Sequence, residues 1–358
     1  MWKSIRKMIN SSKQNQESGN NSTNLQAQTF VVNQGISYTD AKEIALDVFK
    51  ANFLELSQQA SQTAVARAIE LVDDFIEKLE KRNPESIKSV ETPGFQYALF
   101  NAQKEYARTG DKDLSEVLVD ILVDRAKQKE RNLMQIVLDE SIVIVPKLTI
   151  QQMDTLSLIF LLKYSQNYSV HNYISLKNYI DTYLIPLTTN LSKEHSLFQH
   201  LEFTGCGSIS IGEQKIENIF KSTYKGLFLK GFTREDFEKR FEDFVNYENL
   251  IITCLNDKSR FQINAISDEV LSGILEKNQI NDTGKINSIK ELFGHNLMND
   301  DEVIEKLTLC HLGMKNLIDI WNESSMKNTT LTSVGIAIAN ANIRRKTGIS
   351  IDLGIWIK

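Results

Sequence analysis

Histidine and cysteine are the side chains best suited to hold a metal or to act as nucleophile and base, and this chain of 358 residues has five histidines and three cysteines. No two histidines lie four residues apart, and no Cys-x-x-Cys or His-Glu-x-x-His motif occurs. Cys310 and His311 are adjacent, so their side chains diverge on a helix, and we expect a core thiol beside a surface imidazole. The sequence therefore predicts no metal site, no cofactor and no catalytic residues.

Phosphate chemistry would need a glycine-rich loop, and the nearest match is the run FTGCGSISIG at residues 203–212. A phosphate loop follows a strand and carries a lysine after its last glycine, and this run has neither feature, so we predict a turn. Tyrosines gather in residues 168–187. We expect them to form packing layers of the core rather than a ligand site, as buried tyrosines commonly do.

The overall composition narrows the class of protein. The net charge is −5, and acids and bases are interspersed, so no nucleic-acid-binding surface is expected. Cys206, Cys254 and Cys310 are odd in number and widely spaced, which favours buried free thiols in a reducing compartment. No apolar run is long enough to cross a membrane, and the N-terminus lacks a signal-peptide pattern, so we expect a cytoplasmic protein.

The elements that would position any site are helices, and the longest predicted helix covers residues 37–82. Ser37 and Asp40 resemble a capping box at its start, and Pro84 ends it. A helix of this length extends about 65 Å, longer than a compact domain is wide, so one half is expected to pack on a partner. Apolar residues recur on one face in steps of three and four: Ala45, Phe49, Phe53, Leu56, Ala60, Ala64, Ala68, Leu71, Phe75 and Leu79.

A polar tail precedes this helix. Residues 1–24 are predicted to be a flexible tether, because they offer almost no apolar surface to bury. Within it, residues 2–9 have the spacing of a short basic amphipathic segment that could touch a membrane surface or a partner. A frayed terminus is the alternative interpretation.

Residues 25–35 are predicted to be a short strand. Leu25, Ala27 and Val31 alternate with polar residues, as on one face of a strand. Identical strands from several copies of the chain could pair with one another. A polar coil, or an edge strand on the chain's own C-terminus, is the alternative.

Residues 84–358 are predicted to form a helical body. Thr92 followed by Pro93 is a helix start, and residues 149–164 are apolar on three sides, as a central core helix would be. Residues 349–357 alternate as a strand does and are apolar enough to require cover. The expected fold class is mainly α, a multi-helical body led by one long amphipathic helix, with a minor β element near each terminus.

Two parts of the chain resemble a known family. The first comprises NNSTNLQA at residues 20–27, GISYTD at residues 35–40 and IALDVF at residues 44–49; the second comprises LTSVGIAIA at residues 331–339 and RRKTG at residues 344–348. Both are similar to segments of an uncharacterised family of bacterial cytoplasmic helical proteins. The resemblance implies a bacterial origin and a shared architecture, and it implies no activity.

These observations lead us to expect a non-enzymatic, homo-oligomeric interaction or scaffold protein of the bacterial cytoplasm, associated with stress or phage defence. Its expected partners are further copies of itself and an unidentified protein. An enzyme whose site is built from scattered residues is one alternative, and a peripheral membrane protein attached through residues 2–9 is another. The residues predicted to mediate self-association are Leu25, Ala27, Val31, Phe49, Phe53 and Leu56.

Overall fold

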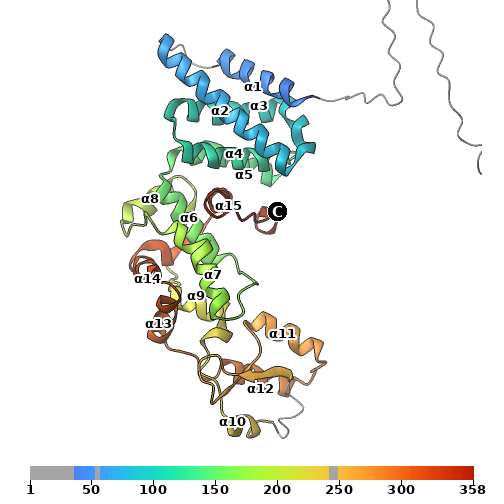
Figure 1. The fold of residues 1–358 in the computed structure, drawn as a ribbon, viewed down its shortest axis with the longest axis vertical. Helices are drawn as coiled ribbons and strands as arrows, with labels where there is room; N and C mark the ends of the chain where they lie inside the picture. The colour runs from blue at the N-terminus through green and yellow to red at the C-terminus, as the bar shows by residue number, and fades with distance from the viewer. Residues whose placement is uncertain (1–35, 53–56, 242–248) are drawn as a thin grey trace, which may run out of the picture.

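The computed structural model describes residues 36–52, 57–241 and 249–358 of the chain. Within these residues the fold is mainly α-helical, with two short antiparallel strand pairs, which confirms the predicted fold class. Figure 1 shows an elongated molecule with the N-terminal helices at one end and the chain's C-terminus beside the centre. Among the described residues, none of the helices combines the length and the apolar character needed to cross a bilayer.

The predicted single helix over residues 37–82 is wrong, because helix α1 (Tyr38–Asn52) and helix α2 (Gln58–Arg82) fold into an antiparallel pair. Lys42 forms an ion pair with Asp73, whereas Phe49 packs beside Ala64, so the two helices run in opposite directions. The physical reason is burial. A straight helix would leave half of its apolar stripe in solvent, and the hairpin buries both halves in one chain.

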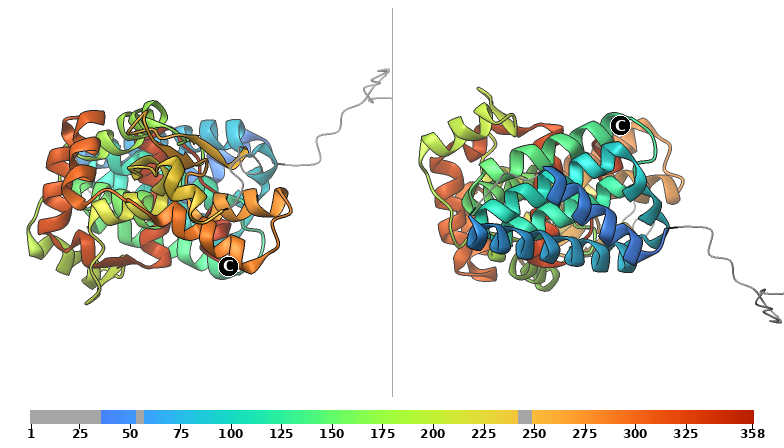
Figure 2. Two further views of the ribbon diagram at one scale, coloured as in Figure 1. Left: turned by 90° about the horizontal axis from the view of Figure 1, so that it is seen from below. Right: turned by 90° about the horizontal axis from the view of Figure 1, so that it is seen from above.

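The N-terminal helices form a layer in which neighbouring helices run side by side, as Figure 2 shows in the view from above. The predicted cap of α1 is present, since Ser37 Oγ donates to Asp40 Oδ2 at 2.7 Å and Asp40 N donates back to Ser37 Oγ at 3.2 Å. Thr92 likewise caps the helix that Pro93 begins. The layer continues through a 3₁₀ helix (Pro84–Glu91), α3 (Pro93–Thr109), α4 (Lys112–Ala126), α5 (Leu133–Ile144) and a 3₁₀ turn (Val145–Lys147).

Two buried helices cross the centre of the molecule. α6 (Ile150–Lys163) begins with a complete capping box at Thr149 and is the central helix that the sequence predicts. α15 (Ser333–Thr347) packs against α4, α5 and α6. Its Gly335 permits close approach of the backbone at Cys206, because a Cβ at that position would lie 1.9 Å from the carbonyl oxygen of Cys206.

Shorter elements surround α6 and complete the main core. The strands pair Gly207 with Leu331 and Ile209 with Thr329. In chain order the elements are α7 (Tyr173–Tyr179), a π-helical turn (Ile180–Leu184), a 3₁₀ turn (Ile185–Leu187), α8 (His195–Phe203), β1 (Gly207–Ile209), α9 (Ile216–Thr223), a 3₁₀ turn (Lys225–Phe228), α13 (Asp300–Cys310), α14 (Gly313–Glu323), a 3₁₀ turn (Ser325–Asn328) and β4 (Thr329–Leu331).

The helical body predicted for residues 84–358 buries its apolar residues in more than one cluster. Buried residues between Leu229 and Phe293 form a second cluster at the far end of the molecule from α1. Strands Ile251–Thr253 and Phe261–Ile263 pair across it. Its elements are α10 (Arg234–Glu238), β2 (Ile251–Thr253), β3 (Phe261–Ile263), α11 (Asp268–Lys277) and α12 (Thr283–Gly294).

The C-terminal tail, defined here as residues 349–357, forms no strand, so the predicted C-terminal β element is wrong. Gly348 turns the chain with a φ of +74°, and a 3₁₀ helix follows at Leu353–Ile355. Leu353 and Ile357 are buried. The alternating pattern therefore reflects a tail that packs one side against helices. The N-terminal strand predicted for residues 25–35 lies outside the described residues.

Candidate functional site

The predicted self-association residues fall into two groups. Phe49 is fully buried beside Ala64, Ala68 and Ala107 of its own chain, so its predicted place on an exposed surface is wrong. Small alanine side chains on α2 leave room for the ring, and this pairing satisfies the apolar stripe without a second copy. The other predicted residues lie outside the described residues: Leu25, Ala27, Val31, Phe53 and Leu56.

The cysteine and histidine side chains take part in packing and hydrogen bonding of the fold. Cys206, Cys254 and Cys310 are free and buried, as predicted, and burial raises the pKa of the Cys206 and Cys310 thiols. His311 accepts a hydrogen bond from the backbone N–H of Gly313 through Nδ1, at 2.9 Å. Across the described ranges, no group of three His, Cys, Asp or Glu side chains is arranged to hold a metal ion.

A cavity of about 510 Å³, which we call the tyrosine pocket, lies between the end of α6, the end of α7 and the C-terminal tail. None of the described residues that line it carries a charge. Its volume falls in the range of small-molecule sites. The lining residues are Leu161, Tyr164, Ser165, Gln166, Asn167, Tyr168, Ser169, Tyr179, Tyr183, Ile349, Ile351, Ile355 and Trp356.

Hydrogen bonds and ring contacts hold one wall of this pocket in place. The Tyr164 hydroxyl accepts from the backbone N–H of Leu331 at 2.8 Å, and Trp356 Nε1 donates to the Tyr164 carbonyl at 3.2 Å. The Trp356 ring also meets the ring of Phe160 edge-on, with centroids 4.8 Å apart. These contacts fix the C-terminal tail against α6, so the wall is preformed.

The opposite wall carries Tyr179 and Tyr183, whose ring centroids are 5.8 Å apart. Tyr179 ends α7, and Tyr183 lies on the π-helical turn, a rare conformation that is frequent at functional sites. Burial and the neighbouring Tyr224 raise the pKa of Tyr179 well above its usual value. Tyr179 is only 5% exposed, and its hydroxyl makes no hydrogen bond to another described residue. The hydroxyl oxygen is not among the described buried polar atoms that lack a partner, so it is accessible from the pocket.

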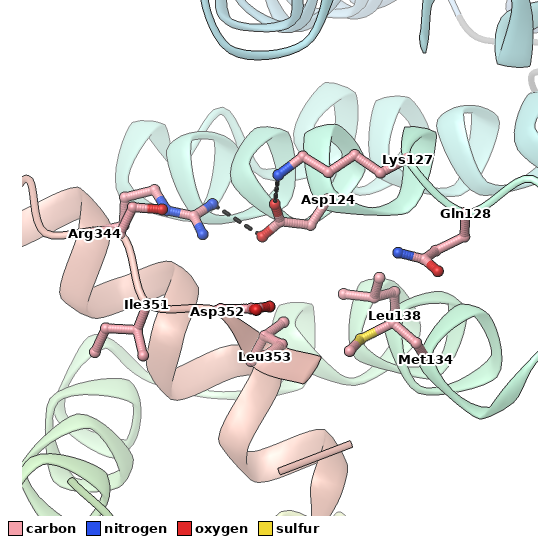
Figure 3. Close-up of a pocket in the computed structure, with 10 residues that line it drawn as sticks. Asp124, Lys127, Gln128, Met134, Leu138, Arg344, Ile351, Asp352 and Leu353 are labelled. Carbon is pink, nitrogen blue, oxygen red and sulfur yellow. Dashed lines mark hydrogen bonds and ion pairs between the residues drawn. The ribbon is translucent and has the colours of Figure 1, made fainter. Parts of the chain in front are cut away.

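A second cavity, of about 310 Å³, lies on the other side of the tail, between α4 and α5. We call it the Arg344 pocket (Figure 3). The carboxylate of Asp124 accepts from Arg344 Nη1 at 2.9 Å and from Lys127 Nζ at 2.8 Å. Met134 and Leu138 form an apolar wall. Ile351 lines both cavities, so the C-terminal tail is a common wall of the two pockets.

The basic end of α15 has a structural role that its sequence does not reveal. Cations are favourable at the C-terminus of a helix, and the structure gives each of these cations a carboxylate partner on another helix. The three ion pairs are Arg344 with Asp124, Arg345 with Asp113 and Lys346 with Asp154.

Sequence reasoning missed the tyrosine pocket because it assigned those tyrosines to packing. That assignment holds for Tyr179, which contacts Tyr224 in the core, but Tyr168 is 73% exposed. The available signal was spacing: Tyr164 and Tyr168, like Tyr179 and Tyr183, are four residues apart, which on a helix gives a shared face. Only the fold shows that both pairs meet the C-terminal tail.

A protein-family model, whose description reads ":-like", matches residues 35–357 and therefore spans both pockets. No curated protein and no solved structure matches the chain.

Proposed function

The chain belongs to the ":-like" family, whose model matches residues 35–357 and so covers every residue of both pockets. From this premise we propose that the protein is a non-enzymatic interaction protein. Its ligand is an uncharged, flat aromatic molecule held in the tyrosine pocket. The observation that carries this proposal is the pairing of an aromatic lining with the hydroxyl of Tyr179, which is accessible and makes no hydrogen bond to a described residue.

The aromatic lining supports a flat ligand. Tyr183 is half-buried and Tyr168 is exposed at the rim, so both rings have a face or an edge that a bound ring can contact. Offset or edge-on aromatic contacts contribute about 0.5–1.5 kcal/mol beyond the burial of apolar area. An acceptor atom on the ligand would give the Tyr179 hydroxyl the hydrogen bond that it lacks.

The absence of charge among the described lining residues supports an uncharged ligand. A phosphate or carboxylate in this pocket would lose hydration without gaining a counter-ion, which is costly. Neutral polar groups at the rim, such as Ser165 and Asn167, suit a molecule with hydroxyl or amide groups at its edge.

The test is a titration of the full chain with three uncharged flat probes, indole, adenosine and riboflavin, followed by calorimetry. Tyr183→Ala should weaken binding of any probe that binds by about tenfold, since it removes a ring contact. Tyr179→Phe should weaken only the probes that carry an acceptor. Tyr97→Ala, an exposed ring on α3, is the matched control and should leave binding unchanged.

Two results would overturn the proposal. One is that none of the three probes binds at concentrations up to about 1 mM, which is weaker than small-molecule recognition needs. The other is that Tyr183→Ala and Tyr97→Ala bind every probe equally well, because the ring of Tyr183 then contributes nothing.

Self-association remains part of the proposal, with a smaller set of residues. Phe49 is buried in the core of its own chain, so the remaining candidates are Leu25, Ala27, Val31, Phe53 and Leu56. The proposal also assigns the protein to the bacterial cytoplasm, and the three free, buried thiols support that assignment, since a reducing compartment keeps thiols unpaired.

A further inference from the structure

The guanidinium of Arg344 is buried with part of its donor set unused. The residue is 7% exposed, and Nη1 donates to Asp124 at 2.9 Å. Nε has no hydrogen-bond partner, and Nη2 donates to none of the described residues. Nε is closed off from solvent, so Nη2 is the donor left for a ligand, and a charged N–H donor makes a strong hydrogen bond to a carboxylate.

The opposite side of the Arg344 pocket carries a carboxylate without a cation. Asp352 accepts from the backbone N–H of Gly354 at 3.0 Å and forms no ion pair with a described residue. Figure 3 shows its carboxylate extending into the space between α4 and α5, toward Gln128. An ammonium group placed there would gain a counter-ion that the protein does not supply.

The remaining lining residues suit a small amphipathic body. Met134 and Leu138 from α5 and Leu353 from the C-terminal tail form the apolar part of the wall. The amide nitrogen of Gln128 faces the same space and adds a donor on the side of α4. The cavity of about 310 Å³ is at the small end of ligand pockets.

We propose that the Arg344 pocket binds a zwitterionic α-amino acid with an apolar side chain. The ligand's carboxylate lies against Arg344, its ammonium against Asp352, and its side chain against Met134 and Leu138. The four charged lining residues sum to zero, since Arg344 and Lys127 balance Asp124 and Asp352. A neutral pocket with separated charges of both signs favours a ligand that is itself neutral with separated charges.

Ligands of a single charge fit this arrangement less well. An anion without an ammonium group would face Asp124 and Asp352 and leave the carboxylate of Asp352 unpaired. An amine without a carboxylate would leave the free donors of Arg344 unsatisfied. The proposal is independent of the tyrosine pocket, which has no charged lining residue among those described.

The test uses calorimetric titration of the full chain with L-leucine and with two compounds that each lack one charged group. L-leucinamide lacks the carboxylate, and 4-methylpentanoate lacks the ammonium. L-leucine should bind, and each comparison compound should bind at least about tenfold more weakly, because each loses one charge-assisted contact.

The variant Asp352→Asn keeps the acceptor for Gly354 N–H and removes the charge. It should weaken the binding of L-leucine by about tenfold or more and should not weaken the binding of 4-methylpentanoate, since that anion has no ammonium to lose a contact and is relieved of a like charge. Asp282→Asn is the matched control, because Asp282 is also exposed and also accepts a backbone N–H, from Lys285 at 2.8 Å. Tyr183→Ala should also leave L-leucine binding unchanged, which separates this site from the tyrosine pocket.

Three outcomes would overturn the assignment, and two of them come from the unmodified protein, so no variant needs to fold for the test to decide. The first is no detectable binding of L-leucine up to about 10 mM, which is below useful affinity. The second is binding of one comparison compound at least as tight as that of L-leucine, which would make the site one for a plain amine or a plain anion. The third is equal binding of L-leucine to Asp352→Asn and Asp282→Asn.

Discussion

Asp154 on α6 and Lys346 on the last turn of α15 form an ion pair in the centre of the molecule, with Lys346 Nζ 2.9 Å from Asp154 Oδ2. Asp154 is fully buried, and its other oxygen accepts from Asn342 Nδ2, also at 2.9 Å. Asn342 in turn donates to Ser157 Oγ. The two central helices are thus joined by a polar network whose members satisfy one another.

Replacing Asp154 with Leu should lower the free energy of unfolding by about 3–5 kcal/mol, because Lys346 and Asn342 would lose their shared acceptor inside the core. Urea denaturation followed by circular dichroism measures this change. Asp319→Asn, which breaks the exposed pair with Lys193, is the control and should have little effect. A loss at Asp154 no larger than that at Asp319 would contradict the view that this network stabilises the centre.

The sequence predicted those parts of the fold that local signals determine. Ser37 and Thr92 mark helix starts through side-chain caps, and each needs only its neighbours to act. The helix over residues 37–82 could not be divided correctly, because its apolar stripe continues without interruption across both halves. Division depends on Phe49 meeting Ala64, and nothing local encodes that contact.

The two pockets could not be predicted from the sequence either, because the residues that form them are far apart along the chain. Arg344 and Asp124 are separated by 220 positions, and Trp356 and Tyr164 by 192. Residue types at these positions are ordinary for a core and a helix end. Their convergence on the C-terminal tail is a property of the three-dimensional packing of α4, α6 and α15, so a single sequence gives no signal for it.

Phe49→Ala tests the hairpin of α1 and α2. Removing a fully buried ring should lower the free energy of unfolding by about 3–5 kcal/mol and leave the molar mass in solution unchanged. Lys50→Ala, on the exposed face of α1, is the control for helix propensity. Chemical denaturation and light scattering on the same samples give both quantities. A variant with normal stability and a reduced molar mass would instead place Phe49 at an interface between copies.

Self-association through the first 35 residues is tested by shortening the chain. The full chain should have a molar mass of a multiple of 40.8 kDa, and a chain that begins at Ser37 should assemble less, because it keeps Phe53 and Leu56 but lacks Leu25, Ala27 and Val31. Multi-angle light scattering at about 50 μM, well above the dissociation constant of a specific interface, makes the comparison. A monomeric full chain, or equal assembly of both chains, would contradict the prediction.

The buried ammonium of Lys163 should make the free energy of unfolding depend on pH, in the range between its pKa in the folded chain and its pKa in the unfolded chain. Its ammonium donates to the carbonyls of Lys327 and Thr329, both at 2.9 Å, and lies 5.5 Å from the centre of the Trp321 ring. The structure gives it no ion pair with a described carboxylate. Burial lowers the pKa of Lys163 to about 8, from a usual value of 10.5.

Because the pKa of Lys163 is lower in the folded state, the unfolded chain binds more protons between about pH 8 and pH 10.5, and stability rises with pH across that range. The free energy of unfolding of the unmodified protein, minus that of Lys163→Met, should therefore increase from pH 8 to pH 10. Taking the difference cancels the buried tyrosines, such as Tyr224, whose pKa burial raises to about 12, since they are present in both proteins. Lys215→Met, an exposed lysine, should show no such trend. A difference that stays flat across the window would mean that Lys163 keeps its ordinary affinity for protons in the folded protein.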